Sequence, residues 1–150
     1  TQVVATTNST FIGLAKSDIH LRSVDDAKNY RIAVLRDDAT HQTLLKKGFE
    51  EGKNLFIVNN THSLLKLLVQ RKSIDLILAD RVTVKYRAQY DNIDPQIFKP
   101  FLHLNNKPFD FYFACSQSTP KATIERINQA MIHIKETGQQ EEIKQRWQSD

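Results

Sequence analysis

Three short apolar segments alternate with two amphipathic segments in the first half of the chain, and this alternation constrains the fold more than any other feature. The apolar segments span residues 30–35, 55–58 and 74–79. The intervening segments, residues 40–48 and 61–70, carry leucines at helical spacing. Because the connections are short, the pattern predicts parallel β-strands joined by crossover helices, which is an α/β fold with a mostly parallel sheet flanked by helices.

Polar and small residues mark the expected ends of the two helices. Thr40 can cap the first helix, and Gly48 stands where that helix ends. Thr61 can cap the second helix. The residues that this second helix is expected to bury are Leu64, Leu65 and Leu68.

The pattern becomes ambiguous after residue 80. Residues 82–88 alternate like a strand, whereas Asp80 can cap a helix at the same place, and both interpretations stay open. Residues 97–104 and 109–115 are predicted to be strands. We expect the alternating phenylalanines of the second strand, Phe109, Phe111 and Phe113, to lie in the core of a sheet.

Two helices are predicted to close the chain. The first begins at Pro120, a residue that the first turn of a helix tolerates, and Gly138 ends it. A last helix follows, with Trp147 as its packing anchor. The apolar face of the first of these helices consists of Ile124, Ile127, Met131 and Ile134.

Composition excludes several classes of protein. The chain has 150 residues, 25% charged and 40% hydrophobic, which is typical of one globular domain. A single cysteine, Cys115, excludes an internal disulfide, and we expect its side chain to be buried and inert. The histidines are scattered without metal-ligand spacing, so no metal or cofactor is expected, and His41 is expected on a helix surface. The net charge of +4 is spread along the chain, so no nucleic-acid partner is expected.

Charged residues follow two of the predicted strands. Arg36, Asp37 and Asp38 follow the first strand, and Asp80 follows the third. Because ligands of open α/β sheets bind outside the carboxyl ends of the strands, we expect these side chains to share one crevice. Three carboxylates against one guanidinium favour a ligand that carries positive charge. Each aspartate taken alone can equally be a helix cap.

One interpretation of these acids is a phosphoryl-accepting receiver domain. Asp37 and Asp38 resemble its paired metal-binding acids, and Asp80 resembles its phosphorylated aspartate. Lys107 resembles the lysine of its lysine motif. The spacing disfavours this interpretation. Only 26 residues separate Asp80 from Lys107, whereas a receiver needs two helices and a strand there, and one crossover alone takes about a dozen residues.

A second interpretation rests on similarity to a family. From Leu21 to its end, the chain resembles extracellular solute-binding proteins of family 3, which include polar amino-acid binders. Residues 67–76 resemble the family's leucine, Gly-Arg, hydrophobic, Asp signature, with Lys72 and Ser73 where glycine is more usual. The other similar segments are residues 21–34, 111–116, 119–120 and 138–147.

The resemblance implies a type II periplasmic-binding fold, with two α/β lobes joined by two crossing strands. Residues 1–22 would be a remnant of the first lobe and a hinge strand, and residues 23–106 the second lobe. Residues 107–150 would be the return hinge strand and the C-terminal helices. Most of the first lobe is missing, so we expect a truncated relative whose last helices pair with a second copy, as a homodimer or a swapped dimer, or with a missing chain.

The resemblance also implies a function without catalysis. We expect a periplasmic or extracellular protein that is not an enzyme and binds a small polar solute between its lobes, as part of an ABC transporter with a membrane permease, or for a sensor kinase. By resemblance, Asp80 lies where the family holds a ligand amino group. The ligand carboxylate would lie against Leu35, Arg36, Asp37, Asp38, Ala39 and Thr40. The resemblance implies an amino-acid-like solute, but Asp37 and Asp38 replace the usual Gly-Thr and would repel a ligand carboxylate, so a cationic solute is the alternative.

Overall fold

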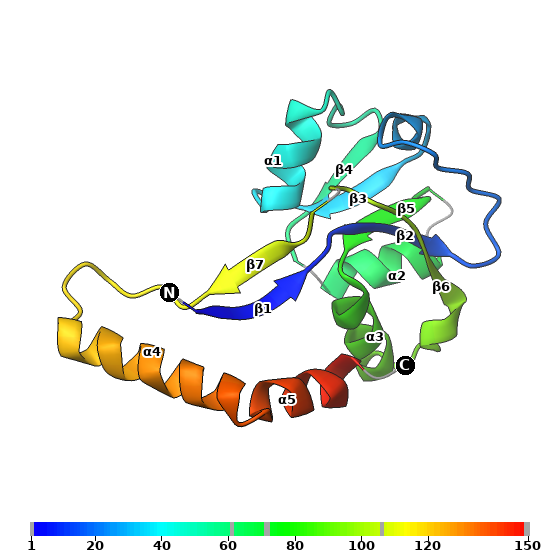
Figure 1. The fold of residues 1–150 in the computed structure, drawn as a ribbon. Helices are drawn as coiled ribbons and strands as arrows, with labels where there is room; N and C mark the ends of the chain where they lie inside the picture. Colours follow the sequence, from blue (N-terminus) through cyan, green and yellow to red (C-terminus); the bar gives the residue numbers. More distant parts are fainter. Residues whose placement is uncertain (1, 61, 71–72, 106, 149–150) are drawn as a thin grey trace. The chain divides into compact units, whose positions relative to one another are not determined.

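The computed structural model describes residues 2–60, 62–70, 73–105 and 107–148 (Figure 1). Its internal contacts divide the chain into two units. Asn8–Lys107 form the sheet unit, and Thr1–Thr7 with Pro108–Asp150 form the ribbon unit. The sequence places the corresponding boundaries at residues 22/23 and 106/107. Strand β2 (Thr10–Leu14), which the resemblance assigns to the hinge, lies inside the sheet of the sheet unit, and the lobe boundaries remain a prediction.

The sheet unit is built on a five-stranded sheet in the order β4-β3-β5-β2-β6. Strands β4, β3 and β5 are parallel, whereas β2 is antiparallel to both of its neighbours. This confirms the predicted α/β fold with a mostly parallel sheet. Besides β2, the elements are η1 (Asp25–Asn29), β3 (Ile32–Leu35), α1 (Ala39–Lys46), β4 (Leu55–Val58), α2 (His62–Gln70), β5 (Leu76–Ala79), α3 (Arg81–Tyr90), η2 (Pro95–Ile97) and β6 (Phe98–His103).

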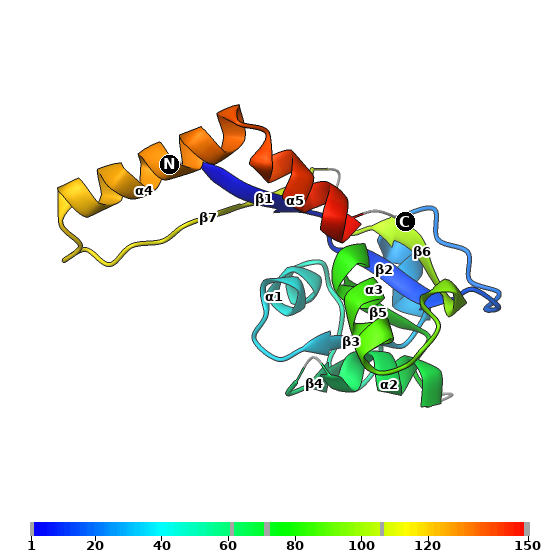
Figure 2. The ribbon, with the colours of Figure 1, turned by 90° about the horizontal axis from the view of Figure 1, so that it is seen from below.

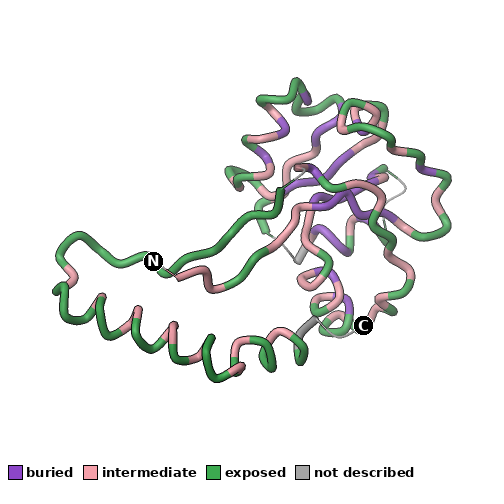
Figure 3. Tube along the Cα trace, in the orientation of Figure 1, coloured by how far each residue is buried: buried purple, intermediate pink, exposed green. Residues whose placement is uncertain are grey.

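Alternation along the strands divides the core between the two faces of the sheet. Ile32 and Val34 of β3 pack on one face with Leu44 of α1, and Ala33 packs on the other. Helices α2 and α3 cover that second face, as Figures 1 and 2 show, and contribute Leu65 and Val84, respectively, to its core. Buried segments are concentrated in the strands between these layers (Figure 3). Hydrophobic burial on both faces therefore fixes which way each strand faces.

The structure decides the helix boundaries that the sequence left open. Residues 81–90 form a helix, because the Asp80 carboxylate accepts a hydrogen bond from the Thr83 backbone N–H and caps it. Helix α1 is capped by Asp38 and not by Thr40, which corrects the predicted cap. Thr61 lies outside the described residues. The three leucines predicted to be buried by α2 are buried: Leu64, Leu65 and Leu68.

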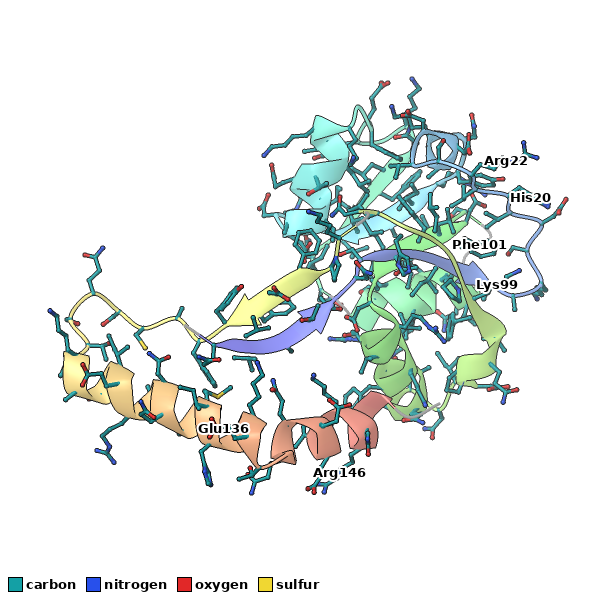
Figure 4. The ribbon with its side chains drawn as sticks, viewed as in Figure 1. His20, Arg22, Lys99, Phe101, Glu136 and Arg146 are labelled. Atoms are coloured by element: carbon teal, nitrogen blue, oxygen red, sulfur yellow. The ribbon has the colours of Figure 1, made fainter. Side chains whose placement is uncertain are left out.

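Gly13 allows β2 to fit between its neighbours. A Cβ atom at this position would lie 3.0 Å from the Asp75 carbonyl oxygen and 3.0 Å from the Phe101 ring. The same part of β6 carries a cation–π contact, with Lys99 Nζ 5.4 Å from the centroid of the Phe101 ring (Figure 4). The absent side chain thus permits the close packing by which an antiparallel strand joins the parallel ones.

The ribbon unit consists of two antiparallel strands and two helices. Strand β1 (Val3–Thr7) pairs with β7 (Phe109–Tyr112), followed by α4 (Lys121–Glu136) and α5 (Gln139–Gln148). The Gln140 side-chain amide donates to the carbonyl oxygens of Val3 and Val4, at 3.3 Å and 2.9 Å. On α4 the predicted apolar residues Ile124, Ile127, Met131 and Ile134 are each half-buried.

Two expectations for the ribbon unit are wrong. The phenylalanines predicted to lie in a sheet core are exposed, at 44% for Phe109, 55% for Phe111 and 56% for Phe113. Cys115 is exposed as well. The reason is that β7 belongs to a two-stranded ribbon, and none of the ribbon unit's described residues is classed as buried. The side chain of Trp147 lies outside what the structure describes.

An ion pair joins β3 and β5 where both strands begin. Arg31 Nε and Nη2 donate to Asp75 Oδ2 and Oδ1 at 3.0 Å and 2.9 Å, and the Arg31 backbone N–H donates to Oδ2 at 2.8 Å. Burial raises the pKa of Asp75, but these hydrogen bonds and the Arg31 charge lower it by more, so the pKa lies below its ordinary value of 3.8. The Asp75 backbone N–H returns a bond to the Arg31 carbonyl oxygen at 2.9 Å.

We predict that Asp75→Asn lowers the free energy of unfolding by about 1–2 kcal/mol at neutral pH, a value kept small because Arg31 is partly exposed. A carboxyl whose folded-state pKa is depressed stabilises the fold above its unfolded-state pKa, and that contribution is lost as the pH falls through the folded-state pKa. Urea unfolding of both proteins checks this. The difference between them should be largest near neutral pH and should shrink below about pH 4; a difference independent of pH would contradict it.

Candidate functional site

The carboxyl ends of β3 and β5 lie at the same edge of the sheet, but there each strand pairs with a different neighbouring strand. The two strands pair through Ile32↔Leu76 and Ala33↔Ile77. Beyond these pairs β3 continues along β4 to Val58, and β5 continues along β2 to Thr10. The chain then enters α1 on one face and α3 on the other. This is a topological switch point, where open α/β sheets bind their ligands.

The turn between β3 and α1 is held by bonds to neighbouring segments. The Arg36 backbone N–H donates to the Val58 carbonyl oxygen at 2.8 Å, and Arg36 Nε donates to Asn59 Oδ1 at 3.0 Å. Asp37 has a φ of 56°, in the left-handed region that residues other than glycine seldom adopt. Its backbone N–H donates to His41 Nδ1 at 3.1 Å.

Two of the predicted site carboxylates cap helices. Asp38 Oδ1 accepts from the Thr40 backbone N–H at 2.6 Å and from the Thr40 hydroxyl. Asp80 Oδ1 accepts from the Thr83 backbone N–H at 2.8 Å. A carboxylate has about four lone-pair sites, so capping leaves each of them able to accept further hydrogen bonds. Capping and ligand binding are therefore compatible roles for Asp38 and Asp80.

His41 is buried, which corrects its expected place on a helix surface. Its side chain is 3% exposed, and its Nε2 lies 3.0 Å from Glu51 Oε1. The ring therefore joins the turn before α1 to the segment after it. The signal that could have predicted this burial is helical spacing, because His41 stands three and four residues before Leu44 and Leu45 on the apolar face of α1.

Sequence reasoning also missed residues that other strands bring to this edge. Thr10 of β2 is buried and pairs with Ala79 on one side and with His103 on the other. Its hydroxyl lies 2.8 Å from His103 Nδ1. Asn59, at the end of β4, holds Arg36 as described. Thr10 and His103 reach this edge because β2 lies between β5 and β6, a long-range pairing that leaves no local signal, whereas Asn59 arrives with β4, which pairs with β3.

The sheet order disfavours the receiver interpretation. On the side away from β3, the strand beside β5 is the antiparallel β2, and among the described residues between Asp80 and Lys107 there is one α-helix, α3, whereas the receiver interpretation requires two helices and a strand there. Asp80 accepts a hydrogen bond from the Thr83 backbone N–H, so the capping of α3 explains an aspartate at this position.

The described residues add two further observations. Among them, no group of three or more His, Cys, Asp or Glu side chains is placed to hold a metal ion. Within the same part of the chain, no helix combines the length and the apolarity that crossing a membrane requires.

Solved structures share this arrangement of elements. A histidine kinase sensor domain with similarity to periplasmic binding proteins matches with a TM-score of 0.78 and 19% identity, over 99% of this chain and 62% of its own. An ancestral arginine-binding protein bound to glutamine matches with a TM-score of 0.72 and 16% identity, over 100% and 63%. The chain has a periplasmic-binding-protein-like fold.

A third match is a probable amino-acid ABC transporter extracellular-binding protein from Bacillus subtilis, with a TM-score of 0.72 and 16% identity, over 100% of this chain and 63% of its own. The periplasmic-binding-protein-like chain thus spans less than two thirds of the length of the structures that it matches. No protein-family model and no curated protein matches the sequence. At these identities the matches establish the fold.

We predict that Asp38→Ala lowers the free energy of unfolding by about 1 kcal/mol, because the Thr40 N–H loses its partner at the start of α1. Asp38→Asn should leave stability nearly unchanged, because an amide oxygen also accepts this bond. Urea unfolding of both variants measures the difference. Equal destabilisation by Asp38→Ala and Asp38→Asn would contradict the capping role. If Asp38→Asn is as stable as expected, it also provides a folded protein that lacks the charge of Asp38.

Proposed function

We propose that this chain belongs to a solute-binding protein that holds a small polar solute at the carboxyl edge of the five-stranded sheet and does not transform it. The solute would lie against residues 35–40 on one side and Asp80 on the other. The observation that carries the proposal is that the pairing between β3 and β5 ends before this edge, with α1 and α3 on opposite faces of the sheet. Structures of the same fold include proteins whose names describe amino-acid binding and sensing.

The hydrogen bonds of the turn support a cationic solute. The donors that would otherwise hold a ligand carboxylate are engaged within the chain: the Asp37 N–H by His41, and the Thr40 N–H and hydroxyl by Asp38. The carboxylates of Asp38 and Asp80 retain acceptor capacity. A solute carboxylate brought among these acids would meet like charge and lose its hydration, which is costly. An amine or a guanidinium would instead be paired.

We further propose that a first lobe, of which this chain would carry only a remnant, forms the other wall of the site. The matched structures are longer than this chain. Residues 1–22 and 107–150 would supply the remnant of the first lobe, the hinge strands and the C-terminal helices, around a second lobe of residues 23–106. A solute that contacts both lobes favours the closed state by its differential affinity. The closed form would act at a membrane permease or a sensor kinase, on the periplasmic or extracellular side.

An NMR titration tests the proposed site on the chain as it is. Agmatine, which carries an amine and a guanidinium, should shift the amide signals of residues 36–40 and 80. Arginine, which differs from agmatine by its α-carboxylate, should shift them less, because the carboxylate meets Asp37 and Asp38. Because this chain supplies one wall of the proposed site, we expect weak binding, and the absence of any response to both compounds at millimolar concentration would contradict the proposed function. A stronger response to arginine would contradict only the cationic preference.

Two matched variants identify the carboxylate responsible. Asp80→Asn keeps an oxygen for the Thr83 N–H and removes the charge, so it should reduce the agmatine response about tenfold, as expected for one charged hydrogen bond. Asp94→Asn is the control, because Asp94 caps η2 by the same kind of bond to the Gln96 N–H, beside the start of β6. Equal effects of the two substitutions would exclude a specific role for Asp80.

For the ribbon unit, we propose association with a second copy or with another lobe. The exposed phenylalanines and Ile143, which is 52% exposed, support this because apolar surface of this kind favours burial. Light scattering coupled to size-exclusion chromatography measures the state in solution. A dimer that dissociates on Phe111→Asp would support the second copy. A monomer with no binding of a hydrophobic dye would contradict association through this surface.

A further inference from the structure

We propose that His41 is a positioning residue of the solute site: its buried ring holds Asp37, in the turn of residues 36–40, in a left-handed conformation and takes the Asp37 N–H away from the solute. This inference rests on the proposed function, because it assigns a role in the same site. His41 itself would not touch the solute. It would act through the backbone of Asp37 and so through the direction of the neighbouring carboxylates.

The hydrogen bonds of the ring define its protonation. Nδ1 accepts the Asp37 N–H at 3.1 Å, so this nitrogen presents a lone pair. The single proton of the neutral ring then lies on Nε2, which is 3.0 Å from Glu51 Oε1. Both ring nitrogens therefore have hydrogen-bond partners although the side chain is only 3% exposed. The structure thus assigns the Nε2–H tautomer to His41.

The bond from Asp37 counteracts a local preference of the backbone. At a φ of 56°, an aspartate is in a conformation that is disfavoured unless its surroundings hold it. The His41 ring is the acceptor that the structure gives for the Asp37 N–H. Without that acceptor, the turn loses a reason to stay left-handed. The Asp37 carboxylate would then be redirected, and its N–H would become a donor for an anionic solute.

Packing alone does not account for a histidine at this position. An apolar side chain could fill a buried site on α1 without the cost of removing two ring nitrogens from water. The two partners of the ring belong instead to the turn before the helix and to the segment after it, at Asp37 and Glu51. The histidine therefore connects the solute turn to a fixed point on the sheet unit.

Two substitutions separate the two bonds of the ring. In His41→Asn the side-chain oxygen lies near the position of Nδ1 and can accept the Asp37 N–H. In His41→Gln the side-chain amide nitrogen lies near the position of Nε2 and can donate to Glu51, while the acceptor for Asp37 is lost. The pair is matched in chemistry, because both variants replace the imidazole by an amide.

Amide hydrogen exchange and the agmatine titration read out the two variants. We expect His41→Gln to lose about tenfold in protection of the Asp37 amide and about tenfold in agmatine affinity, as expected for one hydrogen bond. His41→Asn should retain both within about threefold. In the unsubstituted protein, the nitrogen NMR signals of the imidazole should show the Nε2–H tautomer, a measurement that needs no variant.

The outcomes distinguish this inference from the proposed function. A wild-type ring protonated at Nδ1, or equal Asp37 exchange in the wild type and His41→Gln, would overturn the positioning role alone. Lost protection with unchanged agmatine affinity would also overturn it. A wild-type protein that responds to neither agmatine nor arginine would overturn the proposed function, and the inference with it.

Discussion

The short backbone ladder between β3 and β5 is the interaction on which the carboxyl edge of the sheet depends. It sets two parallel strands side by side through Ile32↔Leu76 and Ala33↔Ile77, and the Arg31–Asp75 ion pair links the two strands immediately before these pairs. Since the ladder ends before the strands do, each strand then follows its outer neighbour. The loops that leave them start at the same edge and diverge to opposite faces, which brings Asp38 and Asp80 to that edge on different helices.

The charges at this edge are held in place by bonds within the chain. Asp38 and Asp80 each cap a helix, where the helix dipole favours a negative charge. Arg36 is held by Asn59, and the Asp37 N–H by His41. In this turn the Asp37 N–H and the Thr40 N–H and hydroxyl are engaged within the chain, whereas the carboxylates keep acceptor capacity. Under the proposed function, the same interactions that stabilise the two helix starts would also favour a cationic solute.

Local patterns predicted the parts of the fold that depend on neighbouring residues. The strands β3, β4 and β5, the leucines of α2 and the carboxylates after β3 and β5 follow from short segments and their spacing. The insertion of β2 could not be predicted, because it depends on pairs separated by about 70 residues or more, such as Phe11↔Leu78 and Phe11↔Leu102. The exposure of Phe111 likewise depends on tertiary packing, which alternation along one segment does not report.

A crystal structure of the chain grown with agmatine tests the central claim most directly. The account predicts a cationic nitrogen within hydrogen-bond distance of a carboxylate oxygen of Asp38 or Asp80. Agmatine bound solely at another surface, with both carboxylates still making only their capping bonds, would contradict it.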